Sequence, residues 1–539
     1  MTFCADAADI DAFHAAGWWD DVTISARVAQ LAASRPGDAA YLSVAAGATA
    51  ATVTTWARYD ELADAVAGAI SGAGLAPGDR IAVVIPDGPE VHAALVGAER
   101  AGVVAVGIGA RAGDRELRHL VSLTGARALC TLDAVRGRPA TELRDALAGA
   151  GAAIDRHVVI SPDGVTVDGV RGVAAPFAGR ALGPDELFLL NSTSGTTGLP
   201  KCVMHTQNRW KYFHRLAAAA GEFGDDEALF GAVPAPFGFG LWTAHFTPAL
   251  LGAPTVVMER FDADTALDLI AAHRVTVLCC VTTQFIMMLN AQAARPRDLS
   301  SLRSMFTGGE NVPDERAAEF EQTTGARVLQ FYGSNETGAL SCTTTVDTRE
   351  RRLSTAGRVI DEMHVRLFDP ATGVDITGSS EPGQPGCKGP ATCLGYWGDE
   401  EANAKLYTPD GWMLMGDIVT IDPEGYLRVV GRVSDFIIRG GKNISAPAVE
   451  DEVGTHPDVT MVAAVPMPDP VFGERVCIYV VAREGATVTL ERIVEHLTAR
   501  GVSKEWFPEY LVVVDDLPRS SGGKVAKGEL TDDARRRVR

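Results

Sequence analysis

The segment Leu187–Lys201 reads LFLLNSTSGTTGLPK and joins a strand-like apolar run to a loop of small and hydroxylated residues. Gly195 and Gly198 allow backbone N–H groups to come close to a ligand, and the Ser and Thr hydroxyls add further hydrogen-bond donors. Lys201 adds a positive charge, so the loop is suited to the oxygens of a polyphosphate. A flexible surface turn has a similar composition, but the apolar run before the loop and the helical pattern over residues 207–220 after it favour a structured loop.

This loop does not match the Walker phosphate loop, G-x-x-x-x-G-K-[ST]. Counting from Gly195, Pro200 stands where the second Gly is required, and Cys202 stands where the final hydroxyl is required. The function of the loop therefore depends on which other motifs accompany it.

Short apolar runs alternate with helical patterns on both sides of the loop. RIAVVIPDG (residues 80–88) indicates a buried strand, and PEVHAALVGAERAG (residues 89–102) indicates the helix that follows it. The same order recurs further along the chain, where TALDLIAAHRV (residues 265–275) precedes TVLCCVTT (residues 276–283). This alternation predicts an α/β fold with parallel strands.

The chain is too long for one compact core, because single cores stop growing near ~250–300 residues. After about residue 360 the sequence becomes rich in Gly and Pro, which indicates turns and short strands. A run of short helical and strand-like segments then predicts a small α+β domain of about one hundred residues. We therefore expect an N-terminal domain over residues 1–433 and a C-terminal domain over residues 434–539, without a long flexible linker.

Composition excludes several classes of function. Hydrophobic residues make up 46% of the 539 residues and the net charge is -20, which argues against wholesale binding of nucleic acid or anionic membrane. The N-terminus is acidic and lacks a signal-peptide pattern, and no apolar run reaches the ~18 residues of a membrane span. Nine cysteines without a C-x-x-C spacing fit the reduced thiols of a cytoplasmic protein.

Five motifs, taken in chain order, resemble those of the adenylate-forming superfamily, which includes acyl-CoA synthetases, non-ribosomal adenylation domains and luciferases. The family's phosphate loop T-S-G-T-T-G-x-P-K appears as Thr193, Ser194, Gly195, Thr196, Thr197, Gly198 and Lys201. The family's Y-G-x-T-E appears as Tyr332, Gly333, Ser334, Asn335 and Glu336. The remaining motifs supply the family aspartate as Asp417, the hinge segment as Gly431, Arg432 and Asp435, and the C-terminal P-R-x-x-x-G-K as Pro518, Arg519, Gly523 and Lys524. Two positions depart from the pattern, since Cys202 replaces a Gly and Asn335 replaces a Thr.

The resemblance implies that the protein activates a carboxylate with ATP to give an acyl adenylate and pyrophosphate, and that a thiol then displaces AMP. It implies that the loop Thr193–Lys201 holds the β- and γ-phosphates and that Glu336 binds Mg²⁺, a hard cation that suits carboxylate and phosphate oxygens. Tyr332 is expected on one face of the adenine, with Asp417 and Arg432 at the ribose and Asn335 near the α-phosphate. The opposite wall for the adenine is expected from Gly308, Gly309, Glu310 and Asn311.

The resemblance also assigns roles to the small C-terminal domain. Lys524 corresponds to the family lysine that neutralises charge during adenylation, although a solvated lysine in a basic tail is the alternative. Asp435 corresponds to the hinge about which this mobile lid domain swings after adenylation. Gly441 corresponds to a glycine that lines the pantetheine channel, with Gly440 beside it. Lys442, together with Arg439 and Arg475, is a candidate contact for CoA phosphates, or else ordinary charged surface.

The acid is expected to bind along PAPFGFGLWTAHFTPALLGAP, residues 234–254, which offers Phe237, Phe239 and Trp242. The segment has no acidic residue to receive an α-amino group and no Asn beside a His, so an apolar acid fits best, whether alicyclic, aromatic or medium-chain. The aromatic side chains either shorten the pocket or pack a core. Overall the chain resembles cyclohexanecarboxylate-type and medium-chain-type acid–CoA ligases, which implies ATP, Mg²⁺ and CoA as ligands and leaves a homodimer possible.

Three alternatives to a CoA ligase remain open from the sequence. The acyl group could pass to a carrier-protein phosphopantetheine thiol, which needs the same activation chemistry. A luciferase-like oxygenase could share the same motifs. A weakened ligand-sensing homologue is a further alternative, and the departures at Cys202 and Asn335 are its only support.

Overall fold

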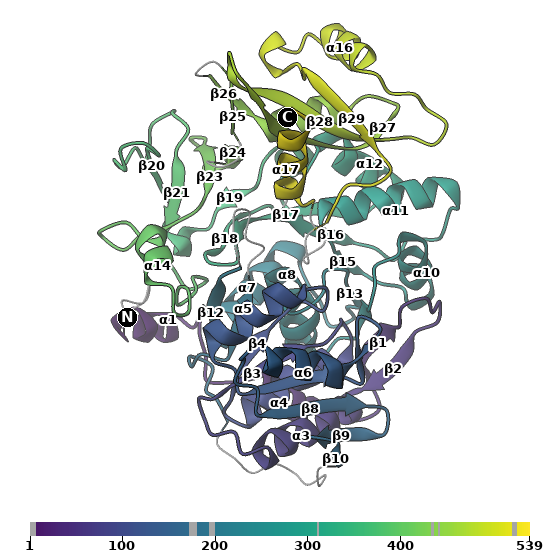
Figure 1. Ribbon diagram of the computed structural model, residues 1–539, viewed down its shortest axis with the longest axis vertical. Coiled ribbons are helices and arrows are strands. Elements are labelled where there is room, and N and C mark those ends of the chain that lie inside the picture. Colours follow the sequence, from purple (N-terminus) through teal and green to yellow (C-terminus); the bar gives the residue numbers. More distant parts are fainter. Residues whose placement is uncertain are drawn as a thin grey trace.

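The computed structural model describes residues 7–171, 181–192, 200–309, 312–432, 436–439, 442–519 and 525–538 (Figure 1). Two large sheets and a smaller β-rich region build the N-terminal part of the chain, and a fourth sheet with its helices forms the C-terminal part. The prediction of a large α/β domain followed by a small C-terminal α+β domain is confirmed.

The first large sheet is parallel in its centre and antiparallel at its edges. Its central strands are buried on both faces because helices connect and cover them, as parallel strands require. In spatial order its strands are β19 (Arg358–Val359), β18 (Gly338–Cys342), β17 (Arg327–Ser334), β16 (Ser304–Gly308), β15 (Val277–Cys279), β13 (Leu229–Gly231), β14 (Thr255–Met258), β1 (Ala39–Val44) and β2 (Thr52–Thr55).

The second large sheet contains β11, the strand that precedes the loop Thr193–Lys201. Strand β11 pairs in parallel with β4 and antiparallel with β12, which returns the chain after the loop. In spatial order its strands are β10 (Val170–Arg171), β9 (Gly164–Val167), β8 (Arg156–Ser161), β5 (Ala128–Leu132), β3 (Arg80–Val84), β4 (Val104–Gly107), β11 (Leu189–Ser192) and β12 (Cys202–His205).

Helices cover these sheets and follow the strands as the sequence pattern predicted. The segment expected to be helical after residue 88 is α4, and the one expected near residues 207–220 is α7. The helices of the N-terminal part are α1 (Ala7–Ala15), α2 (Ile24–Ser34), α3 (Trp56–Gly72), α4 (Pro89–Arg100), α5 (Asp114–Thr124), α6 (Ala140–Gly149), α7 (Gln207–Gly221), α8 (Gly238–Gly240), the π-helix Leu241–Phe246, α9 (Thr247–Leu251), α10 (Ala263–His273), α11 (Thr282–Ala294), α12 (Asp314–Thr324), α13 (Arg349–Ser354) and α14 (Glu400–Leu406).

Short strands follow the large sheets, as the Gly- and Pro-rich composition predicted. Strands β20 (Arg366–Phe368), β21 (Gln384–Cys387) and β22 (Met413–Leu414) form one small sheet, and β23 (Asp417–Ile421) pairs with β24 (Leu427–Arg432). A β6–β7 hairpin (Ala134–Val135 and Arg138–Pro139) lies beside the second large sheet. Strand β23 begins at Asp417, so this region carries a predicted site residue at a strand end.

The C-terminal sheet is covered on both faces, which the alternation along β28 (Gly473–Ala482) explains. Val476, Ile478 and Val480 pack with helices α15 (Ala446–Gly454) and α16 (Leu490–Ala499), whereas Cys477 and Tyr479 pack with α17 (Lys527–Arg537). The other strands of this sheet are β25 (Phe436–Arg439), β26 (Lys442–Ser445), β27 (Val459–Asp469) and β29 (Tyr510–Val514).

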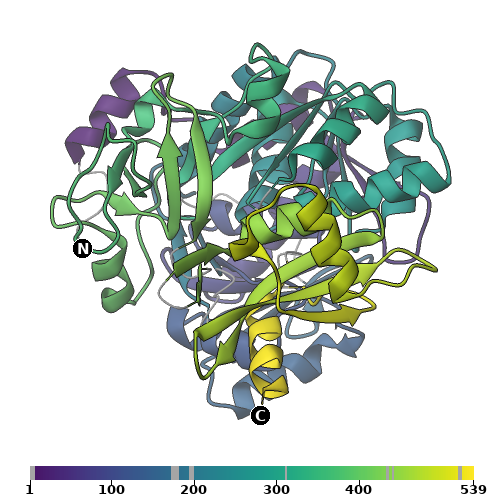
Figure 2. The same ribbon diagram turned by 90° about the horizontal axis from the view of Figure 1, so that it is seen from above.

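The C-terminal domain lies above helices α11 and α12 and over the middle of the N-terminal domain (Figures 1 and 2). Its contacts with the larger domain include Arg500 with Glu315 at 3.6 Å and the Ser445 hydroxyl with the Val430 carbonyl at 2.7 Å. Within the described part of the chain, no helix is both long and apolar enough to cross a membrane.

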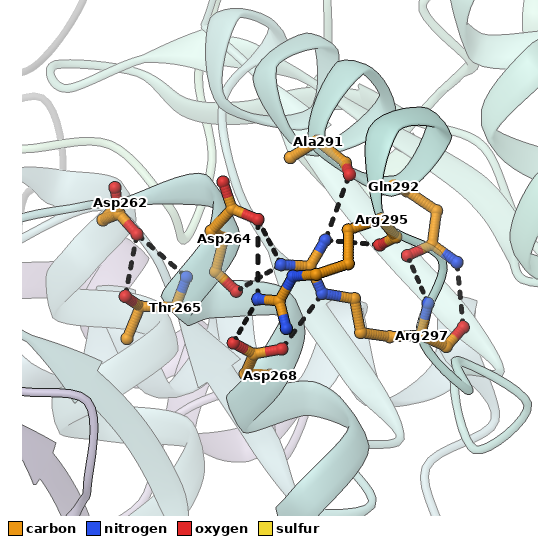
Figure 3. Close-up of polar contacts among 8 residues, drawn as sticks. All are labelled: Asp262, Asp264, Thr265, Asp268, Ala291, Gln292, Arg295 and Arg297. Carbon is orange, nitrogen blue, oxygen red and sulfur yellow. Dashed lines mark hydrogen bonds and ion pairs between the residues drawn. The ribbon is translucent and has the colours of Figure 1, made fainter.

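An ionic cluster joins α10 to the segment after α11 (Figure 3). Arg297, whose side chain is only 5% exposed, pairs with Asp264 and with Asp268, the latter at 3.0 Å. The Gln292 side chain donates to the Arg297 carbonyl at 2.8 Å and accepts from the Arg297 backbone N–H at 3.0 Å. The cluster therefore anchors the end of α11 on the first turn of α10.

Arg297→Met is expected to lower the stability of the protein at pH 7 and to have less effect in acid. The hydrogen bond from Arg297 holds the pKa of Asp264 below its usual value. A carboxyl with a lowered folded-state pKa stabilises the fold above its unfolded pKa of about 3.9 and loses that contribution as the pH falls through its folded pKa. Urea unfolding at pH 7 and near pH 3.5 measures the difference between variant and wild type. A difference that stays constant with pH would contradict the assignment, and Arg58→Met, which breaks an exposed helical pair with Glu61, is the control.

Candidate active site

Several predicted site residues lie outside the described residues. These are Thr193, Ser194, Gly195, Thr196, Thr197, Gly198, Glu310, Asn311, Asp435, Gly440, Gly441 and Lys524. The described residues nevertheless fix the two strands that flank the loop Thr193–Lys201, because Ser192 pairs with Cys202 and Asn191 with Val203 in the β11–β12 ladder. The roles of the undescribed residues stay predictions.

The chain brings its predicted ligand-binding segments to one edge of the sheets. The loop after β11, the Gly308–Gly309 turn after β16 and the turn after β17 all follow the carboxyl ends of strands. Ligands of open α/β sheets bind outside this edge. Adding a Cβ at Gly308 would place it 2.2 Å from the Phe331 carbonyl oxygen, and one at Gly333 would lie 1.8 Å from that of Gly338. Both positions therefore need glycine so that the backbones can approach.

Asp417, which is predicted to contact the ribose, lies at the start of β23 and is 7% exposed. Its Oδ2 accepts a hydrogen bond from the Tyr332 hydroxyl at 2.9 Å, and its Oδ1 accepts one from Arg432 Nε at 2.9 Å. Burial and the neighbouring Asp417 raise the pKa of Tyr332, so the phenol stays protonated and donates. Three of the predicted nucleotide-binding residues are thus in direct contact, and each Asp417 oxygen keeps a second lone pair for a ligand hydroxyl.

Glu336 and Lys201 both contact Tyr396, a residue that was not predicted from the sequence. The Tyr396 hydroxyl donates to Glu336 Oε1 at 2.8 Å, and Lys201 Nζ lies 4.6 Å from the centre of the Tyr396 ring. Burial and then Glu336 raise the pKa of Tyr396, which keeps it a donor. The only signal in the sequence was an aromatic residue in the turn-rich segment LGYWGD.

This donor set fits ATP with Mg²⁺. The described residues contain no group of three or more His, Cys, Asp or Glu side chains that could hold a metal by themselves. Mg²⁺ at nucleotide sites is bound by one or two carboxylates together with substrate phosphates and water, so the single carboxylate of Glu336 beside the cationic Lys201 is compatible with it.

The acid-binding segment divides into exposed and buried aromatic residues. Phe237 and Phe239 are partly exposed, whereas Trp242 is 1% exposed on the π-helix. Four phenylalanines surround the Trp242 ring, with centroid distances of 4.9 Å to Phe213, 5.2 Å to Phe239, 5.5 Å to Phe306 and 5.7 Å to Phe331. Trp242 therefore packs as a core residue does, and a buried ring at this place in the segment is also compatible with a short acid pocket.

Behind the site lies a set of buried polar side chains that the sequence reasoning also missed. Asn191 and His205 are fully buried and Arg209 is 2% exposed. Asn191 is hydrogen-bonded to Asn335, and Arg209 donates to the carbonyls of Asn335 and Glu336. A helix that starts with polar residues but is buried, as α7 is, was the available signal.

The predicted CoA contacts are only partly described. Arg439 pairs with Glu509 at 2.6 Å and Arg475 with Asp469 at 2.5 Å. Both guanidinium groups therefore already have acidic partners, and Lys442 is placed only through its backbone in β26.

Residues 28–397 match the AMP-binding enzymes, and residues 448–524 match the AMP-binding enzyme C-terminal domain. The chain belongs to the AMP-binding enzyme family. Its sequence is 33% identical over 357 residues to a medium-chain fatty-acid–CoA ligase of Escherichia coli, covering 66% of this chain and 62% of that protein. It is 30% identical over 543 residues to the salicyl-AMP ligase / salicyl-S-ArCP synthetase of Mycobacterium tuberculosis, covering 98% and 93% of the two chains.

The fold of this family member is also that of solved structures. ATP-bound MatB from Rhodopseudomonas palustris superimposes with a TM-score of 0.81 at 26% identity, covering 96% of this chain and all of that one. These findings confirm the prediction of an adenylate-forming superfamily member that uses ATP, an AMP-forming acid–thiol ligase.

Proposed function

We propose that this enzyme activates a compact apolar acid, aromatic or alicyclic, as its acyl adenylate and transfers the acyl group to CoA. The observation that carries the choice of acid is the closed aromatic cluster around Trp242. Trp242 and Phe306 are only 1% and 0% exposed, so among the described residues no water-sized space touches these two rings, whereas Phe237 and Phe239 are partly exposed. A long flexible chain would need such space, whereas a single ring would not, so the medium-chain acids are disfavoured.

The chemistry asks the protein to bring two anions together. The acid carboxylate attacks the α-phosphorus of ATP, pyrophosphate leaves, and the thiol then attacks the acyl carbonyl and displaces AMP. Positioning and charge neutralisation supply most of the acceleration of such a step. Mg²⁺, when bound, neutralises phosphate charge.

Each group of residues has a role in this scheme. Asp417, Tyr332 and Arg432 would hold the nucleoside, and Lys201 with the loop Thr193–Gly198 would hold the departing phosphates. Glu336, oriented by Tyr396, would bind the metal ion. Lys524 would lie against the reacting groups during adenylation, and the C-terminal domain, from residue 434 with its hinge at Asp435, would then turn to admit the thiol through the channel at Gly440 and Gly441.

A second candidate acceptor is a carrier-protein phosphopantetheine thiol. The salicyl-S-ArCP synthetase among the relatives supports it, and the E. coli ligase supports CoA. We take CoA as the first acceptor to test, and the experiment below separates the two acceptors. A homodimer and a cytoplasmic location stay predictions.

The experiment that tests the function is a panel of carboxylates with ATP and Mg²⁺, in which pyrophosphate and AMP are followed with and without CoA. Benzoate, cyclohexanecarboxylate, hexanoate and decanoate sample ring and chain acids. Turnover of a ring acid that requires CoA, with the thioester identified by mass, is the expected result. Pyrophosphate release that is unchanged by CoA would move the acceptor to a carrier protein, and a preference for decanoate would contradict the compact pocket.

Trp242→Leu is expected to shift the preference of the enzyme towards longer acids. Removing the indole opens space within the aromatic cluster, and a large-to-small change of this kind costs about 3–5 kcal/mol of stability at most. The ratio of kcat/KM for octanoate to that for benzoate should rise by roughly tenfold or more, since one methylene in an apolar pocket is worth about 1–3 kcal/mol. Trp56→Leu, at an equally buried tryptophan of α3, is the control for lost stability. An unchanged ratio in Trp242→Leu would show that Trp242 does not limit the pocket.

A further inference from the structure

A buried chain of hydrogen bonds connects the acid-binding segment to the turn that carries Glu336. Asn191 is at its centre and uses all four of its hydrogen-bonding positions. Its Nδ2 donates to the Pro236 carbonyl at 3.0 Å and to Asn335 Oδ1 at 3.3 Å. Its Oδ1 accepts from Asn335 Nδ2 and from His205 Nε2, both at 2.7 Å. The orientation of this amide is therefore fixed.

The series of hydrogen bonds continues through His205 to Arg209, and the proton positions on the imidazole follow from its partners. Asn191 Oδ1 can only accept, so His205 donates through Nε2 and its Nδ1 accepts from Arg209 Nη1. Burial, and then the charge of Arg209, lower the pKa of His205, which agrees with this neutral tautomer at pH 7. The remaining Arg209 contacts are to the carbonyls of Asn335 at 3.0 Å, Glu336 at 3.2 Å and Ala391 at 2.8 Å.

Arg209 is a buried cation held by neutral groups. It is 2% exposed, and its hydrogen-bond partners among the described residues are His205 and three backbone carbonyls, so no carboxylate contacts it directly. Burial lowers its pKa, and the nearby Cys393 and Glu336 oppose that shift. Burying an unpaired guanidinium is costly, and good hydrogen-bond geometry offsets only part of that cost. Two of its four hydrogen-bond partners are carbonyls of the turn that carries Glu336. A third is the carbonyl of Ala391, which packs against Gly338 at the end of that turn, so the arginine holds the turn in position.

We propose that Asn191 and Arg209 are positioning residues that hold the acid-binding segment at Pro236–Phe237 against the metal-binding turn at Glu336. This inference rests on the proposed function. It also gives Asn335, which stands where the family has Thr, a role within the chain of hydrogen bonds. The two segments are closely packed, because a Cβ added at Gly238 would lie only 2.7 Å from Asn335 Oδ1.

The test uses the full-length protein and the variants Asn191→Leu, Arg209→Met and the double variant. Two quantities are measured: the KM for the acid found in the panel, and the Kd of ATP with Mg²⁺ by calorimetry without acid. Asn191→Leu removes the bonds to Pro236, Asn335 and His205 and should raise the KM for the acid by about tenfold. It should change the Kd of ATP by less than about twofold, because Arg209 still holds the carbonyls of Asn335 and Glu336. Arg209→Met should weaken both. The double variant should be no worse than Arg209→Met, since both residues act through one chain.

Matched controls separate positioning from a general loss of packing. Gln292→Leu removes a buried, bracketing amide from the end of α11 (Figure 3), and Arg80→Met removes a partly buried arginine that donates to the carbonyls of Thr124 and Gly125. Both should leave the KM for the acid and the Kd of ATP unchanged. If Asn191→Leu does not fold, Asn335→Thr, at a partly exposed position, breaks two bonds of the same chain and should raise the KM for the acid in the same way.

Two results would overturn the inference while leaving the proposed function intact. One is an active wild-type enzyme whose KM for the acid is unmoved by Asn191→Leu or Asn335→Thr. The other is a double variant whose losses multiply. A wild-type protein that releases no pyrophosphate with any acid of the panel would instead overturn the proposed function, and this inference with it.

Discussion

Lys524→Ala should slow the formation of acyl adenylate by about 10²–10³-fold and leave thioester formation from supplied acyl adenylate within about twofold of wild type. The first step joins two anions, so loss of an ammonium group at the reacting atoms removes stabilisation of the transition state. The second step is proposed to use a different face of the C-terminal domain. Pyrophosphate release reports the first step, and thioester yield from synthetic acyl adenylate with CoA reports the second.

Lys527 provides the matched control for this prediction. It lies three residues after Lys524 in the sequence and pairs with Glu450 at 2.7 Å, so Lys527→Ala removes a like charge from the same segment of the sequence. It should leave both half-reactions near wild type. Equal losses of the two half-reactions in Lys524→Ala would show that the lysine supports the domain rather than the adenylation step.

Asp417→Ala should weaken the binding of ATP by about 10- to 100-fold and leave the KM for the acid nearly unchanged. Hydrogen bonds to a charged group contribute about 1.5–3 kcal/mol, and the variant also leaves the buried Tyr332 hydroxyl without its acceptor. Calorimetry with ATP and with AMP measures the loss. It should be similar for the two nucleotides, because Asp417 is assigned to the ribose and not to the phosphates.

Tyr332→Phe separates the ribose contact from the internal hydrogen bond. This variant keeps the ring and the Asp417 carboxylate but removes the 2.9 Å contact between them. It should weaken ATP binding less than Asp417→Ala does. If the two variants lose the same affinity, the role of Asp417 is to hold Tyr332, and the ribose assignment is wrong. Asp422→Asn, at an aspartate that pairs with Arg351 and lies away from the predicted nucleotide contacts, is the control.

Much of the fold was available from the sequence because its signals are local. The alternation of apolar runs with helical patterns predicted β3 and α4, and the continuous apolar character of those strands predicted a parallel sheet with covered faces. The order of five motifs predicted the family, and the chain length together with the change of composition after about residue 360 predicted the two-domain organisation. Tyr332, Asp417 and Arg432 were assigned to the adenine and ribose of the nucleotide, and Asp417 contacts both of the others in the structure, although Tyr332 is 85 residues away in the chain.

The contacts behind the site could not be obtained in this way. Tyr396 contacts Glu336 across 60 residues of chain, and Asn191 contacts Asn335 across 144. A tyrosine in a turn-rich segment and an asparagine at a strand end carry no local pattern that names their partners. These contacts depend on the tertiary structure, which brings the ends of β11 and β17 together.

The sequence by itself therefore determined the α/β class, the family and the chemistry of the reacting groups, because each depends on residue types at short, fixed spacings. The tertiary structure decided which aromatic residues of the acid-binding segment are core and which polar residues support the site. Trp242 and Phe239 are three positions apart and similar in character, yet only Trp242 is enclosed by Phe213, Phe306 and Phe331. Burial is a property of the whole packed chain, since it depends on which distant side chains fill the surrounding space.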